Sequence, residues 1–93
     1  MDVDPNTYLM NPDFIEQAIT SKTKAILPTQ LNGRCCDMDA LRAIAKKHDL
    51  IIIEDAAQAL GAKYKGEFAG TMGLAGTISF YPAKTLGSFG DAG

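Results

Sequence analysis

The chain has 93 residues, of which 46% are hydrophobic and 22% charged, with a formal net charge of -2. This composition is typical of a soluble globular protein, because disordered chains have fewer apolar residues and more unbalanced charge. No basic stripe could neutralise a row of phosphates, and the longest apolar run, residues 50–53, is far shorter than the roughly 20 residues that cross a bilayer. We therefore expect neither nucleic acid nor a membrane as a partner.

The two cysteines, Cys35 and Cys36, are adjacent, so a disulfide between them would join no distant segments. No other cysteine lies at the spacing of a zinc site, and the single histidine, His48, is distant in sequence. We predict two reduced packing thiols, a cytoplasmic location and no bound metal.

Two amphipathic helices are expected. Asn11 can cap the first, and Pro12 suits its opening turn, after which apolar residues follow at helical spacing. The second begins at Asp37 or Asp39. Its apolar face is predicted to contain Met38, Leu41, Ile44, Ala45 and His48.

Residues 24–27, 50–53 and 77–81 have the composition of strands. The first ends at Pro28, which cannot donate to a central ladder. The second shows no alternation, which is typical of a strand covered on both faces by helices. Since a helix separates the first two strands, we expect them to be parallel. The predicted fold class is α/β, a three-layer αβα arrangement with a mostly parallel sheet.

Polar residues that follow strands of an open parallel sheet are the first candidates for a site. Glu54 and Asp55 follow the second strand, and a carboxylate there can cap a helix, bind a metal or pair with a cationic ring nitrogen. Gln58, one turn later, could share the ligand of Asp55. Ser79 is expected on the third strand, and Lys84 in the loop after it. Apolar neighbours would partly desolvate the Lys84 amine and favour its nucleophilic free base, although a surface role is the alternative.

Three ordered motifs connect these residues: EDAAQALGAKYKG at 54–66, SFYPAK at 79–84 and GDAG at 90–93. Together they resemble the core of the DegT/DnrJ/StrS sugar aminotransferases, which are pyridoxal-phosphate enzymes of the aspartate aminotransferase fold. The resemblance covers essentially the whole chain. Because family members have several hundred residues, it implies that residues 1–93 are a partial cofactor-binding large domain, truncated at both ends.

Carried onto the matching positions, the resemblance implies a role for each candidate residue. Asp55 would bind the pyridinium nitrogen and keep it protonated. Lys84 would bond covalently to pyridoxal 5'-phosphate and, when released, act as the acid/base catalyst. Ser79 would hydrogen-bond the cofactor phosphate, Gln58 would contact the phenolic oxygen, and Ala57 would lie near the ring face.

The resemblance also implies a substrate class. The enzyme would transfer an amino group, with glutamate as donor, onto a nucleotide-linked keto sugar for lipopolysaccharide, surface-glycan or antibiotic sugars. It would be a cytoplasmic homodimer, and the fragment alone would be inactive. Gln30 stands where many members carry a histidine, and residues 90–93 stand where Glu-Gly-Gly is common.

Two alternatives remain open. One is a sugar dehydratase relative, against which Lys84 argues, because such relatives carry histidine at this position. The other is a non-catalytic α/β module that binds a small ligand or a regulatory partner. The aminated carbon, the nucleotide and the stereochemistry are not determined by these residues.

Overall fold

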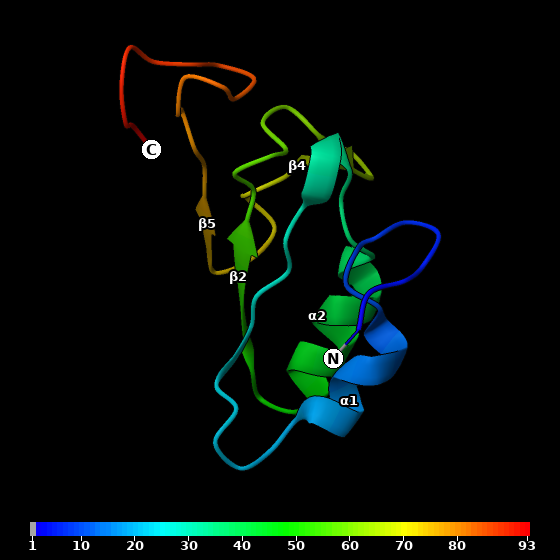
Figure 1. Cartoon of the computed structure of the whole chain (residues 1–93). Helices are drawn as coiled ribbons and strands as arrows, with labels where there is room; N and C mark the ends of the chain where they lie inside the picture. Colours follow the sequence, from blue (N-terminus) through cyan, green and yellow to red (C-terminus); the bar gives the residue numbers. More distant parts are fainter. Residues whose placement is uncertain (1) are drawn as a thin grey trace.

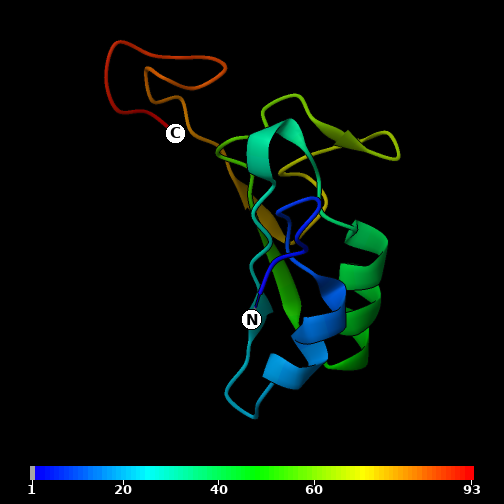
Figure 2. The same cartoon turned by 45° about the vertical axis from the view of Figure 1, so that its right-hand side comes forward.

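The computed structural model describes residues 2–93. Its centre is a parallel sheet of three strands in the order β1-β2-β5, with both labelled helices on the same side of it (Figures 1 and 2). The strands are β1 (Ala25–Ile26), β2 (Ile51–Asp55) and β5 (Ala75–Thr77). The α/β class with a parallel sheet is confirmed.

The first helical segment begins where the sequence predicts. Pro12–Phe14 forms a short 3-10 helix, η1, which continues into α1, Ile15–Ala18. The side chain of Asn11 accepts a hydrogen bond from the Asp13 backbone N–H at 3.0 Å, which satisfies one of the free donors at the helix start. Ile15 is its buried anchor.

Helix α2, Met38–Lys47, is the longest helix of the described chain. Asp37 is its N-cap and accepts a hydrogen bond from the Ala40 backbone N–H at 3.1 Å. The structure thus selects Asp37 over Asp39 as the start. The side chains that α2 buries belong to the predicted apolar face and are Met38, Leu41 and Ala45.

The register of the sheet places the ends of its strands side by side. Ala25 pairs with Ile51 in the β1–β2 ladder, and Asp55 pairs with Thr77 in the β2–β5 ladder. A further parallel bridge joins Thr29 to Asp55. The carboxyl ends of all three strands therefore meet at one edge of the sheet.

Strand β2 does not show the double burial that its unbroken apolar sequence predicts. Its burial alternates, because Ile52 and Glu54 are buried whereas Ile51 is 42% exposed. Within residues 2–93 the helices cover one face of the sheet (Figure 2). The third layer of the predicted αβα arrangement stays a prediction.

The prediction of a strand over residues 77–81 is wrong in its position. Strand β5 spans Ala75–Thr77, so the pairing residues lie earlier and include a glycine. Gly76 is needed there, because a Cβ at this position would collide with the Gly70 carbonyl oxygen. Beyond β5, the Phe80 N–H donates to the Ala92 carbonyl at 2.8 Å, so this stretch pairs with the end of the chain.

A small hairpin, β3 (Lys63–Tyr64) and β4 (Glu67–Phe68), was not expected from the pattern. Lys65 and Gly66 at its turn both have positive φ, the geometry of the tight turns that join antiparallel strands. Side chains fasten the hairpin to α2, the donor and acceptor pairs being Arg42 with Glu67, Tyr64 with Asp37, and Lys65 with Asp39.

Both cysteines are free thiols, as predicted. Cys36 is buried and Cys35 half-buried, and this burial raises the pKa of each thiol above its ordinary value.

Among the described residues, no helix has the length and apolar character that a membrane crossing requires. The short 3-10 helix η2, Leu31–Gly33, lies between β1 and the cysteine pair.

Candidate functional site

Asp55 is the last residue of β2 and is half-buried. Its backbone is held on both sides: its N–H donates to Pro28 O at 2.9 Å, and its carbonyl accepts from the Gln30 N–H at 2.8 Å. Its Oδ1 accepts a hydrogen bond from the Ala57 N–H at 3.1 Å. Within residues 2–93, Oδ2 has no hydrogen-bond donor, so it can accept one from a ligand.

Ala57 and Gln58 form the turn that follows β2. The turn is tied to both neighbouring segments, because Ala56 N–H donates to Thr77 O at 2.9 Å and Gln58 O accepts from Gly33 N–H at 2.9 Å. Ala57 is half-buried, whereas the side chain of Gln58 is exposed. The turn is therefore a fixed platform with a polar side chain at its surface.

Ser79 and Lys84 lie in the segment after β5. Ser79 is half-buried and stands two residues past the strand, which corrects its predicted place on one. Its Oγ accepts from the Tyr81 N–H at 3.3 Å, so the hydroxyl hydrogen is available to a ligand. The Lys84 N–H donates to Tyr81 O at 2.8 Å in a tight turn.

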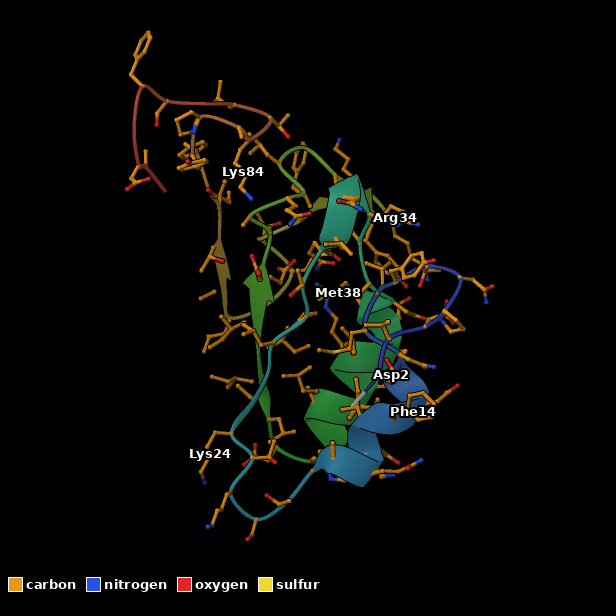
Figure 3. The ribbon with its side chains drawn as sticks, in the orientation of Figure 1. Asp2, Phe14, Lys24, Arg34, Met38 and Lys84 are labelled. Atoms are coloured by element: carbon orange, nitrogen blue, oxygen red, sulfur yellow. The ribbon has the colours of Figure 1, made fainter. Side chains whose placement is uncertain are left out.

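The side chain of Lys84 is half-buried and makes no ion pair within residues 2–93. It lies in the segment that projects beyond the sheet, at the end where β2 and β5 finish (Figure 3). The C-terminal residues fold over this segment, because Ser88 N–H donates to Phe80 O at 2.7 Å. The Lys84 side chain therefore extends from a loop that backbone hydrogen bonds hold together.

The topology collects the candidate residues at one edge of the sheet. Because β2 and β5 are adjacent and parallel, the turn after β2 and the segment after β5 leave the sheet on the same side. The turn carries Asp55, Ala57 and Gln58, and the segment carries Ser79 and Lys84. We call these five residues the candidate site.

The donors and acceptors of the candidate site fit pyridoxal phosphate. Asp55 offers a free carboxylate oxygen, which suits a protonated ring nitrogen. Lys84 offers an amine outside any ion pair of the described chain, which suits an aldehyde. Ser79 offers a hydroxyl donor, which suits a phosphate oxygen. Within residues 2–93, no cluster of three or more potential metal ligands is found.

Two buried polar residues beside the candidate site were not assigned a role from the sequence. Glu54 and Gln30 are both fully buried, and Gln30 Nε2 donates to Glu54 Oε2 at 2.9 Å. Gln30 Oε1 also accepts from the Cys36 N–H at 2.7 Å. Gln30 stands where the resemblance places a histidine in many family members, and its side-chain amide makes hydrogen bonds within the protein. The sequence did indicate that Glu54 is unusual, because a charged residue there directly follows the apolar residues of β2.

The match to a family model extends over the entire chain: residues 1–93 match the DegT/DnrJ/EryC1/StrS aminotransferase family. The chain belongs to this family. Members of the family are similar to it over its whole length. The chain is 54% identical to the "Pleiotropic regulatory protein" of Geobacillus stearothermophilus and 48% identical to the UDP-2-acetamido-2-deoxy-3-oxo-D-glucuronate aminotransferase of Pseudomonas aeruginosa.

Both alignments cover 100% of this chain but only 25% and 26% of those relatives, so the chain spans about a quarter of their length. Among solved structures, an aminotransferase from Psychrobacter cryohalolentis superposes with a TM-score of 0.93 at 44% identity, over 97% of this chain and 23% of that one. An E coli GDP-4-keto-6-deoxy-D-mannose-3-dehydratase with bound hydrated PLP superposes with a TM-score of 0.88 at 32% identity, over 97% of this chain and 23% of that one. The family fold therefore serves pyridoxal phosphate enzymes.

Proposed function

We propose that the chain is the cofactor-binding part of a longer sugar aminotransferase that uses pyridoxal 5'-phosphate. The observation that supports the proposal is that a carboxylate and an amine are carried by segments that leave adjacent parallel strands at the same edge of the sheet. Asp55 ends β2, and Lys84 lies in the loop after β5. Position and chemistry both match the needs of a ring with a nitrogen on one side and an aldehyde on the other.

Each candidate residue then has a task that its surroundings support. Asp55 Oδ2 holds the proton of the ring nitrogen, while the Ala57 N–H fixes the other carboxylate oxygen. Ser79 Oγ donates to a phosphate oxygen. Gln58 would contact the phenolic oxygen from its exposed turn, and Ala57 would lie beside the ring face.

Lys84 has two tasks at the same atom. Its Nζ would hold the cofactor by condensing with the aldehyde with loss of water, and as the free amine it would move the proton that accompanies amino transfer. When bound, the cofactor supplies an electron sink for the carbanion of the substrate. The loop that carries Lys84 is held by backbone hydrogen bonds, among them Lys84 N–H to Tyr81 O at 2.8 Å and Ser88 N–H to Phe80 O at 2.7 Å.

The proposed substrate is a nucleotide-linked keto sugar, and the proposed amino donor is an amino acid such as glutamate. Support comes from the named activity of the Pseudomonas aeruginosa relative, which acts on a UDP-linked oxo sugar according to its name. We also propose a cytoplasmic homodimer that contributes to lipopolysaccharide, surface-glycan or antibiotic sugars. Residues outside this chain would complete the phosphate, sugar and partner-subunit contacts.

The decisive experiment traps the amine. The full-length enzyme is loaded with pyridoxal phosphate, reduced with borohydride and digested, and the labelled peptide is identified by mass spectrometry. We expect the label on Lys84. We also expect Lys84→Ala to lower turnover by about 10²- to 10⁴-fold, since it removes the acid/base group. Lys63→Ala, in the hairpin, is the matched control and should retain the label and the activity. A label on another lysine would refute the assignment.

A regulatory module is the second candidate, and the name of the Geobacillus stearothermophilus relative favours it. The two functions make different predictions for the same protein. A regulatory module without catalysis would take up no borohydride-stable label at Lys84 and would not aminate any keto sugar nucleotide. A dehydratase would consume the keto sugar without incorporating nitrogen from the amino donor, which an isotope-labelled donor measures directly.

A further inference from the structure

Glu54 is a buried charged residue that the roles given above do not use. It precedes Asp55 in β2, and successive side chains of a strand point to opposite faces. Asp55 therefore faces the candidate site from one side of the strand while Glu54 is fully buried on the other. A carboxyl group in such a place requires partners, because desolvating a charge is costly.

Four hydrogen bonds satisfy the Glu54 carboxylate. Oε1 accepts from the Met72 N–H at 2.5 Å and from the Gly73 N–H at 2.8 Å, and Oε2 accepts from the Gly70 N–H at 2.8 Å and from Gln30 Nε2 at 2.9 Å. Every partner is an N–H donor, which suits the two acceptor oxygens of a carboxylate. Within residues 2–93 no cation pairs with it.

The loop that supplies three of these donors is shaped to reach the carboxylate. Gly70 has a φ of +87°, a backbone conformation that residues with a side chain rarely adopt. At Gly73 a Cβ would lie 2.6 Å from the Ile52 carbonyl oxygen. Both glycines thus let the backbone of residues 70–73 lie directly against β2, with its N–H groups directed at one anion.

The fourth donor connects the carboxylate to the other side of β2. Gln30 belongs to the loop after β1, and its backbone N–H donates to the Asp55 carbonyl at 2.8 Å. Its side chain bridges Glu54 and the Cys36 N–H. Glu54 therefore joins the loop after β1 and the loop before β5, which are the two segments that enclose the end of β2.

We propose that Glu54 is a positioning residue: its buried anionic carboxylate holds these two loops on either side of β2 and thereby fixes Asp55 at the candidate site. The consequence for the cofactor rests on the proposed function, whereas the consequence for the Asp55 backbone does not. Removing the charge loosens residues 70–73 first and Asp55 next, through Gln30.

The test uses the full-length protein and the isosteric variant Glu54→Gln, which brings an NH₂ group toward N–H donors. Hydrogen exchange followed by NMR or mass spectrometry reports on the amides of residues 70–73 and of Asp55. We expect exchange at both places to become about tenfold faster or more. Cofactor affinity, followed by absorbance, should fall on the order of 10- to 100-fold, because a small displacement of a binding group is expensive.

Two control variants separate positioning from general loss of stability. Leu41→Ala opens a cavity in the core at a fully buried residue that has no hydrogen bond to either loop. Glu16→Gln removes an exposed carboxylate from α1, whose ion-pair partners Lys47 and His48 lie outside both loops. Both should leave the Asp55 amide exchange and the cofactor affinity within about twofold of the unmodified protein.

The outcomes distinguish this proposal from the proposed function. If the unmodified protein binds no pyridoxal phosphate, the proposed function fails, and the exchange of the Asp55 amide alone decides the positioning role. Unchanged exchange at Asp55 in Glu54→Gln, or an equal change in Leu41→Ala, overturns the positioning role. If Glu54→Gln does not fold, the test uses Gln30→Leu, which removes one of the four donors. We expect hydrogen exchange at the same amides to become faster in this variant. An exchange rate equal to that of the unmodified protein would overturn the proposal.

Discussion

Two adjacent carboxylates at the end of β2 show how strongly surroundings decide the task of a side chain. Asp55 keeps one oxygen without a hydrogen-bond donor within the described chain, and its side chain is half-buried. Glu54 is fully buried, and both of its oxygens are saturated by N–H donors. The first can bind a cation from outside, while the second can only organise the protein around it.

Asp55→Asn tests the first of these tasks. The amide has nearly the shape of the carboxylate but lacks the charge, so it cannot hold a proton on a ring nitrogen. We expect cofactor affinity to weaken by about 1.5–3 kcal/mol, the usual contribution of a hydrogen bond to a charged group. Absorbance titration with pyridoxal phosphate measures it, and Asp13→Asn in the exposed first helix is the matched control. Equal affinities for the two variants would contradict the role of Asp55.

At the scale of elements, helix α2 connects the core to the hairpin. Its buried side chains pack toward the sheet, while its exposed face binds the hairpin through polar groups. Arg42 forms a bidentate pair with Glu67 at 2.8 and 3.0 Å, and its guanidinium also donates to Met72 O at 3.0 Å. Through Met72, this contact touches the loop that surrounds Glu54.

Asp37 is the residue on which two elements depend. Its Oδ1 accepts from Ala40 N–H at 3.1 Å as the helix cap and from the Tyr64 hydroxyl at 2.9 Å, and these hydrogen bonds lower the pKa of Asp37. Desolvation, and after it the hydrogen bond to Asp37, raises the pKa of Tyr64. We expect Asp37→Ala to lower the free energy of unfolding by about 1 kcal/mol, as for other lost caps. Urea denaturation measures it. Asp37→Asn keeps the cap and should lose less than half as much; a loss as large as that of Asp37→Ala would contradict the capping role.

At the scale of the whole molecule, exposed ion pairs and caps tie the segments together. Glu16 in α1 accepts from Lys47 Nζ at 2.7 Å and lies 3.0 Å from His48 Nε2, so it joins the first helix to the end of α2. Together with the Arg42–Glu67 pair, it links the C-terminal end and the middle of α2 to other segments. These contacts are exposed, so each contributes little to stability by itself.

Acid should weaken this set of contacts. Hydrogen bonds with Lys47 and His48 lower the pKa of Glu16, the bond with Arg42 lowers that of Glu67, and backbone N–H donors lower the pKa of Asp4 and Asp37. For such groups the stabilisation is complete above the unfolded pKa and is lost as the pH falls through the lower folded pKa. We expect the melting temperature to be constant above about pH 5 and to fall toward about pH 3.

Differential scanning calorimetry across this pH range measures the effect. The double variant Glu16→Gln with Glu67→Gln should have a lower melting temperature near neutral pH and a shallower fall in acid, because two of the responsible groups no longer titrate. A fall as steep as that of the unmodified protein would show that other groups cause the acid sensitivity. High salt should reduce the difference between the two proteins at neutral pH.

Local rules were enough to determine several features of this chain. The cap Asn11, the buried face of α2 and the parallel order of β1 and β2 follow from side-chain chemistry, apolar spacing and chain order. The sequence left the start of α2 open between Asp37 and Asp39, and the structure selected Asp37. The motifs around Asp55 and Lys84 likewise indicated the family, which the match over residues 1–93 confirms.

Only the tertiary structure decided where β5 lies and what Glu54 does. Residues 77–81 have the side chains of a strand, yet a strand needs a partner. The residues that pair with β2 are Ala75–Thr77, and Gly76 among them leaves room for the Gly70 backbone. The Glu54 carboxylate likewise depends on donors 24 positions earlier and up to 19 positions later in the chain. Such contacts depend on which segments fold against each other, and no local pattern of apolar and polar residues contains that information.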